Sequence, residues 1–138
     1  MKKILFLCTG NSARSIIAEC ILNHLGQNKY LAYSAGSNPV GSVNPYTVKV
    51  LKKNNINYKK IFSKSWDFFK KVEFDIVITV CNNAANETCP LFIGSSKKLH
   101  WDLKDPAIFK GNEEEKLAEF QNVYNQIENL IKREFINK

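Results

Sequence analysis

Short apolar runs alternate along the chain with longer stretches in which apolar residues recur every three to four positions. An uninterrupted apolar run is typical of a strand buried on both faces of a parallel sheet. The runs cover residues 2–7, 30–36, 74–80 and, more weakly, 97–103. Strands that alternate with helices in this way predict an α/β fold, in which a mostly parallel sheet has helices on both faces.

Helical spacing marks the segments between and after the predicted strands. These segments are residues 11–26, 44–55, 63–71 and 112–134. Gly26 suits the C-terminal cap of the first helix, and Asn44 with Pro45 gives the second helix its cap and its first position. The last segment is acidic at its start and basic near its end, which favours a long amphipathic helix.

The length of 138 residues fits one domain, residues 1–138, with a core that needs no disulfide or structural metal. No window contains the roughly 18 uninterrupted apolar residues of a membrane span, and the apolar start is too short for an export signal. The net charge of +7 comes mainly from scattered lysines, which indicate a solvated surface and not a nucleic-acid-binding face. We therefore expect a cytoplasmic monomer with no nucleic-acid or membrane partner.

Candidate chemistry begins in the loop after the first predicted strand, which reads "CTGNSARS" over residues 8–15. Backbone amides in such a loop can curl around one anion, and the helix that follows points its positive N-terminus into the same space. Gly10 permits tight curvature, Asn11 can fix an unusual backbone conformation, and Arg14 can bind two oxygens of the anion. The predicted oxyanion site consists of Thr9, Gly10, Asn11, Ser12, Ala13 and Arg14.

Cys8, at the head of this loop, is the predicted nucleophile. The positive field that would bind an anion also lowers the pKa of the Cys8 thiol, and the Ser15 hydroxyl can donate a hydrogen bond to its sulfur. The alternative is a buried structural thiol at a strand end, with Arg14 as a surface charge. A cysteine followed by five residues and an arginine, between a buried strand and a helix start, favours the nucleophile.

A cysteine that displaces an oxyanion needs a general acid to protonate the departing oxygen. Asp105 follows the last predicted strand, and ligands of parallel sheets bind at the carboxyl ends of the strands. We therefore predict Asp105 as this acid. His100 is its rival, but we expect a packing residue there, because a thiolate stabilised by a helix terminus and an arginine needs no imidazole.

Cys81 and Cys89 bracket the polar segment "NNAANET" directly after a strongly apolar strand. A phosphatase needs one cysteine, whereas an enzyme with further thiols can discharge an oxidised thiolate as a disulfide. Zinc would also explain grouped cysteines, but the usual pairs separated by two to four residues are missing. We therefore predict that Cys81 and Cys89 are redox-active, that no metal is bound, and that Cys20 belongs to the core.

The motifs, in their order along the chain, resemble those of arsenate reductases in the low-molecular-weight tyrosine phosphatase superfamily. They are "CTGNSARS", "YSAGS", "VNP", "SKSWD", "ITVCNNAANETCP" and "HWDLKDPA", followed by the acidic start of the last helix. The resemblance covers nearly the whole chain. It implies a four-stranded parallel sheet flanked by helices in three layers, with the Cys-x5-Arg loop at its centre.

The resemblance also implies a mechanism. Cys8 attacks arsenate held by the loop amides and Arg14, and Asp105 protonates the leaving oxygen. Cys81 then attacks the sulfur of Cys8, so that arsenite departs and a Cys8–Cys81 disulfide remains. In three-cysteine members the relay ends with a Cys81–Cys89 disulfide that thioredoxin reduces, whereas other relatives use glutathione and glutaredoxin. Either thiol reductant is external, and no bound cofactor is implied.

Two other functions stay open. A phosphotyrosine phosphatase is the first, although Ile16 and Ala107 stand where phosphatases of this superfamily carry a proline and an aromatic residue. Weak phosphatase activity is reasonable beside arsenate reduction, because phosphate, like sulfate, is an analogue of arsenate. The second is a non-catalytic, redox-regulated domain that binds anions.

The chain departs from the superfamily pattern in two ways. Cys81 and Cys89 are one residue further apart than in the thioredoxin-coupled type, which leaves open whether thioredoxin or glutaredoxin is the partner. Some members bind potassium through positions that resemble Asn11, Glu19 and Ser34. The acidic ligand expected near Ser65 is missing here, so the resemblance does not carry that ion over to this chain, and potassium binding near the loop stays an open question at this point.

Overall fold

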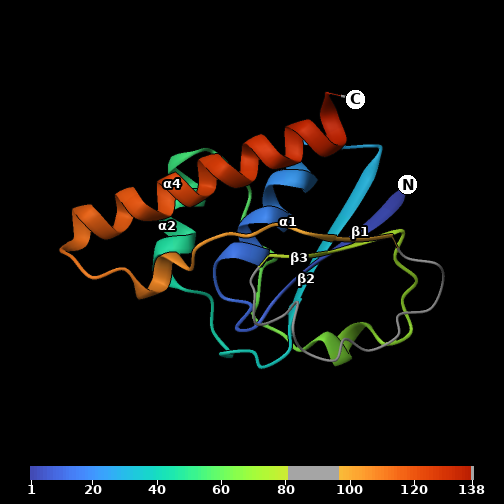
Figure 1. Cartoon of the computed structure of the whole chain (residues 1–138), viewed down its shortest axis with the longest axis horizontal. Coiled ribbons are helices and arrows are strands. Elements are labelled where there is room, and N and C mark those ends of the chain that lie inside the picture. Colours follow the sequence, from blue (N-terminus) through green and yellow to red (C-terminus); the bar gives the residue numbers. More distant parts are fainter. Residues whose placement is uncertain (81–96, 138) are drawn as a thin grey trace.

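The computed structural model describes residues 1–80 and 97–137, in which strands and helices alternate as the sequence predicts (Figure 1). The strands are β1 (Lys2–Cys8), β2 (Tyr30–Gly36), β3 (Ile76–Thr79) and β4 (Lys97–His100). The α-helices are α1 (Arg14–Leu25), α2 (Pro45–Lys53) and α4 (Glu113–Ile131). Shorter 3₁₀ or π-helical segments are η1 (Trp66–Phe69), η2 (Pro106–Ile108) and η3 (Lys132–Ile136).

The four strands run parallel in the order β2-β1-β3-β4, so that β1 occupies an inner position. Residues 4–7 of β1 are fully buried, as expected of a run that is apolar on both faces. Cys8 pairs with Gly36, and Leu7 pairs with Thr79. The carboxyl ends of β1, β2 and β3 therefore lie together at one edge of the sheet. The predicted fold class is confirmed.

Alternate residues of β1 point to opposite sides of the sheet and enter two different cores. Ile4, Phe6 and Cys8 join the larger core, together with residues of α1, α2 and α4, whereas Leu5 and Leu7 join a smaller core beside η1. Figure 1 shows these three helices on one side of the sheet and η1 on the other. A helix is predicted over residues 63–71, but its aromatic residues are weak helix formers, and only the 3₁₀ turn η1 forms.

Local capping explains where the helices begin and end. At the start of α2, Asn44 Oδ1 accepts a hydrogen bond from the N–H two residues later, and Pro45 occupies the first helical position. Asn112 and Glu115 form a capping box at the start of α4, whose three glutamates in the first turn face the positive end of the helix dipole. Gly26 caps α1, as the sequence predicts. None of the described helices is long and apolar enough to cross a lipid bilayer.

Candidate active site

The loop from Cys8 to Arg14 joins the end of β1 to the start of α1. Three of its carbonyl oxygens accept hydrogen bonds from backbone N–H groups of the segment 38–44, at 2.9–3.0 Å. The pairs are Thr9 with Asn38, Gly10 with Val40, and Ser12 with Asn44. Because a trans peptide points its N–H away from its C=O, the amides that follow these carbonyls face the inside of the loop. An array of inward amides is the geometry that binds a tetrahedral anion.

Strand β2 approaches this loop very closely at Gly36. A Cβ atom at this position would lie 2.5 Å from the Thr9 carbonyl oxygen, a distance at which the two atoms overlap. The Gly36 N–H also donates to the Lys64 carbonyl oxygen at 2.9 Å. The loop therefore rests directly on the backbone of its neighbouring strand, with no side chain between them.

Asn11 holds the loop from its buried side. It is fully buried, and its φ of 46° is left-handed, which confirms the unusual backbone conformation predicted for it. Its Oδ1 accepts the Lys64 backbone N–H at 2.9 Å. The amide nitrogen therefore faces two hydroxyls, and it donates to Ser15 Oγ at 2.8 Å and to Ser34 Oγ at 3.0 Å. All three side-chain hydrogen bonds fix one orientation of the Asn11 amide.

The Cys8 sulfur receives two hydrogen-bond donors from this arrangement. The Asn11 backbone N–H donates to Cys8 Sγ at 3.2 Å, and Ser15 Oγ lies 2.8 Å from the same sulfur. Because Ser15 Oγ already accepts a hydrogen bond from Asn11 Nδ2, its own hydroxyl hydrogen is available for Cys8. Donors aimed at the sulfur favour its thiolate form over the thiol. The geometry agrees with the interaction that the sequence predicts for Ser15.

Arg14 and Asp105 meet on the open side of the loop. Arg14 Nη2 lies 3.7 Å from Asp105 Oδ2, and Arg14 Nη1 donates to the Leu103 carbonyl at 2.9 Å. Asp105 Oδ1 also accepts the Ala107 N–H at 2.9 Å, which fixes the carboxylate at the start of η2. The segment after β4 is therefore brought to the loop after β1, as the topology predicts. Both side chains keep some exposure, 13% for Arg14 and 35% for Asp105.

Comparison with known proteins identifies the family. Residues 3–136 match the family model of the low molecular weight phosphotyrosine protein phosphatases. The chain belongs to that family. It is 42% identical over 133 residues to an arsenate reductase of Bacillus licheniformis, which covers 96% of this chain and 94% of the relative. It is also 40% identical over 131 residues to an arsenate reductase of Bacillus subtilis, covering 95% and 93% of the two chains.

Solved structures of this phosphatase family agree with the sequence relatives. One of them, described as an arsenate reductase in the phosphate binding state, has a TM-score of 0.80 and 25% identity, and the match covers 96% of this chain and 95% of that chain. The resemblance inferred from the motifs is therefore confirmed, including its assignment to the arsenate reductases of the family.

The thiols predicted to follow Cys8 in the family's chemistry, Cys81 and Cys89, lie outside the described residues. The described chain ends just before Cys81, at Val80, which lies beside β1. The Val80 N–H donates to the Leu7 carbonyl at 2.8 Å, directly before Cys81 in the sequence. The chain therefore enters the segment 81–96 beside the last residues of β1.

Two other predicted residues differ in outcome. Cys20 is 5% exposed within the larger core, as predicted, and burial raises the pKa of its thiol to about 12. His100 is wrong as a packing residue, because it is exposed and its Nδ1 lies 2.7 Å from Thr79 Oγ1. The packing position in this part of the chain belongs to Trp101, whose ring lies 5.8 Å from that of Phe6.

Lys64 is a residue at this site that the sequence analysis missed. Its Nζ donates to the Phe62 carbonyl at 2.9 Å, and it lies 3.4 Å from Ser34 Oγ and 3.8 Å from Glu19 Oε1. Burial lowers the pKa of Lys64 and raises that of Glu19, and each charge opposes the shift of the other. A lone lysine in "SKSWD" carries no local sign of this contact, which depends on tertiary structure.

These contacts also test the potassium site known in some members of the family. Here an ammonium group lies against Glu19 and Ser34, two of the three positions that would bind the ion. The residues present therefore do not fit a potassium site. Within the described residues, no cluster of three or more His, Cys, Asp or Glu side chains could hold a metal ion.

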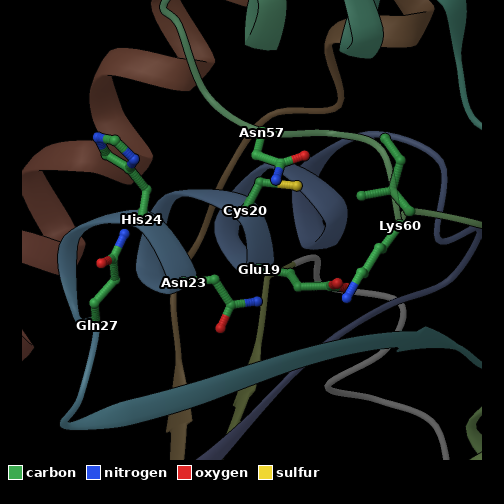
Figure 2. A pocket seen from close by; sticks show the side chains of 8 residues that line it. Glu19, Cys20, Asn23, His24, Gln27, Asn57 and Lys60 are labelled. Atoms are coloured by element: carbon green, nitrogen blue, oxygen red, sulfur yellow. The ribbon is translucent and has the colours of Figure 1, made fainter.

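A pocket of about 250 Å³ is lined in part by Glu19 and Cys20 of α1 (Figure 2). Figure 2 shows polar side chains of α1 and of the segment after α2 around it. The residues that line it are Glu19, Cys20, Asn23, His24, Gln27, Asn57, Lys60 and Ile61. The Cys20 thiol stays protonated at neutral pH, because burial raises its pKa. Cys20 therefore does not supply this pocket with a thiolate that could attack an oxyanion.

Proposed function

We propose that this protein reduces arsenate to arsenite with Cys8 as the nucleophile. The observation that carries the proposal is the pair of donors on the Cys8 sulfur, inside a loop whose amides face inward. The two sequence relatives reported above, which match over most of the chain, are arsenate reductases, and this favours arsenate over phosphate esters as the substrate. The proposed site of action is the cytoplasm, and the proposed active form is a monomer.

In the first step, arsenate binds to the amides of residues 9–13 and to the Arg14 guanidinium, which leaves the Leu103 carbonyl for the oxyanion. The Cys8 thiolate attacks arsenic, so that a sulfur–arsenic bond forms and an arsenic–oxygen bond breaks. Asp105 gives its proton to that oxygen, which leaves as water. The partial exposure of Asp105 supports this role, because solvent can return the proton between turnovers.

Reduction follows when the Cys81 sulfur attacks the Cys8 sulfur. The electron pair of the sulfur–arsenic bond moves to arsenic, arsenite leaves, and a Cys8–Cys81 disulfide forms. Cys89 then attacks Cys81 and releases the Cys8 thiolate, which Ser15 stabilises again. The position of Val80 beside Leu7 supports this relay, because it leads the chain toward Cys8 directly before Cys81.

The cycle needs an external thiol to reduce the last disulfide, either thioredoxin or glutathione with glutaredoxin. Arsenite formation should be measured with each system for the wild type, Cys81→Ser and Cys89→Ser, with Cys20→Ser as the matched control. We expect both relay variants to lose turnover with thioredoxin and the control to keep it. Wild-type rates in both relay variants would contradict the relay.

Trapping the oxidised protein separates the two reductants. A Cys81–Cys89 disulfide found by mass spectrometry indicates the three-thiol relay, and a mixed disulfide with glutathione indicates the other route. Hydrolysis of an aryl phosphate should be measured beside these assays. Strong hydrolysis without arsenate reduction would favour the phosphatase, and phosphate binding without any turnover would favour the non-catalytic domain.

A further inference from the structure

The ammonium group of Lys64 is enclosed near the loop, beside Ser34 and Glu19. The side chain is 8% exposed, and that of Glu19 beside it is 15% exposed. A buried charge is costly unless hydrogen bonds and an opposite charge compensate it. Lys64 has both, because Phe62 supplies a carbonyl and Glu19 a carboxylate. The buried charges of Lys64 and Glu19 are therefore compensated within the folded structure.

One hydrogen-bond chain connects this pair to the nucleophile. Ser34 Oγ donates to Glu19 Oε1 and accepts from Asn11 Nδ2, and Asn11 Nδ2 also donates to Ser15 Oγ. Each hydroxyl has one hydrogen to give. Ser34 therefore donates toward Glu19, Ser15 is left to donate toward Cys8, and the direction of every bond follows from the orientation of Asn11.

Lys64 acts on both ends of Asn11. Its backbone N–H binds Asn11 Oδ1, which turns the amide nitrogen toward the two serines. Its ammonium favours the ionised form of Glu19, which is the form that accepts from Ser34. A protonated Glu19 would instead offer a hydrogen to Ser34, which would compete with the one that Asn11 donates.

We infer that Lys64 is a positioning residue for Cys8, and that its ammonium is the fixed cation that orients the chain from Glu19 through Ser34, Asn11 and Ser15. This assignment rests on the proposed role of Cys8 as a nucleophile. By the same contacts, the Lys64 ammonium takes the place beside Glu19 and Ser34 where some members of the family bind a potassium ion.

The test is the pH dependence of Cys8 alkylation by iodoacetamide, in a background where Cys81 and Cys89 are serine. Cys20 stays silent in this assay below about pH 9, because burial keeps its thiol protonated. In Lys64→Met we expect the midpoint to move up by about half a pH unit or more. In the double variant Lys64→Met/Glu19→Gln, which removes both charges and keeps an acceptor for Ser34, we expect most of that shift to be reversed.

Lys59→Met is the matched control, since it removes an exposed lysine from the same segment. An unchanged midpoint in a folded Lys64→Met protein, or an equal shift in Lys59→Met, would overturn the inference. An equal shift in the double variant would also overturn it, because the effect would then not pass through Glu19. Thermal melting reports whether each variant is folded.

The unmodified protein provides a second measurement that does not depend on any variant. Its alkylation midpoint and its affinity for inorganic phosphate should be the same in potassium and in sodium at equal ionic strength. A shift of either one with potassium would mean that a bound ion does what is assigned to Lys64. Alkylation and phosphate binding need no arsenate reduction, so these results stay separate from the proposed function.

Discussion

The open side of the Cys8 loop and its buried side are built by opposite means. On the open side, Arg14 and Asp105 are partly exposed, and their closest charged atoms are 3.7 Å apart. On the buried side, Asn11, Ser15 and Ser34 have no solvent exposure and are joined by hydrogen bonds of 2.8–3.0 Å. The difference matches two tasks: the groups that must exchange partners with a substrate keep some contact with solvent, and the groups that orient the nucleophile are buried and held by hydrogen bonds.

Replacement of the Cys8 sulfur, which lies between the open and the buried side of the loop, should have the largest effect. We expect Cys8→Ser to lower arsenate reduction by about 10³-fold or more, because a serine hydroxyl is a far weaker nucleophile than a thiolate at neutral pH. The loop amides are unchanged in this variant, so binding of phosphate, measured by calorimetry, should persist. Retained turnover would place the nucleophile elsewhere.

On the open side, Asp105→Asn should lower kcat by about 10²-fold through loss of the general acid. Because its contact with Arg14 is partly exposed, the free energy of unfolding should change by less than about 1 kcal/mol. Steady-state kinetics and urea unfolding measure the two quantities. Asp102→Asn, an exposed aspartate on the same segment, is the control, and an equal loss in that variant would argue against a specific role for Asp105.

On the buried side, activity and stability should fall together. We expect Asn11→Ala to reduce the free energy of unfolding by about 2–4 kcal/mol, since it leaves buried partners unsatisfied at a left-handed position. The kcat should fall by about 10-fold, because Ser15 loses the donor that orients it. Urea unfolding and arsenite assays on Asn11→Ala and on the exposed control Asn38→Ala test this. A catalytic loss without a loss of stability would remove the distinction between the two sides.

The smallest effect is expected away from both sides, at Cys20. We expect Cys20→Ala to change arsenate reduction by less than about twofold, because the thiol is a core residue of α1. In the unmodified protein at pH 8, which is well below its raised pKa, Cys20 should resist alkylation until the chain is unfolded. Peptide mapping by mass spectrometry measures both states, and rapid labelling of native Cys20 would contradict its burial.

Local signals in the sequence were enough to predict most of the elements and the loop that contains Arg14, whereas Asp105 was predicted from the parallel topology of the sheet. The apolar run that becomes β1, the Asn44–Pro45 start of α2 and the acidic start of α4 each depend on residues close in the chain. The "CTGNSARS" loop likewise combines its features within eight positions. Such patterns act over one turn or one strand, so they survive without knowledge of the tertiary structure.

The buried side could be predicted only in part. Asn11 and Ser15 lie within the loop, but Lys64 reaches Glu19 and Ser34 across a long separation in sequence, and nothing in its neighbours indicates burial. The same limit explains His100, since the burial of Trp101 and the exposure of His100 depend on how β4 meets the core. Long-range packing decides these residues, and periodicity does not report it.

The loop carbonyls are hydrogen-bonded to the segment 38–44, and this has a consequence for the selection between arsenate and phosphate. The loop amides are held in place, so they select a tetrahedral oxyanion only by its charge and its size. Arsenate and phosphate are nearly alike in both. The loop therefore cannot discriminate between arsenate and phosphate. Abundant phosphate should act as a competitive inhibitor in steady-state assays of arsenate reduction. Discrimination must therefore come after the oxyanion has bound. An oxyanion on Cys8 either accepts an electron pair and leaves in reduced form, or it returns to solution unchanged.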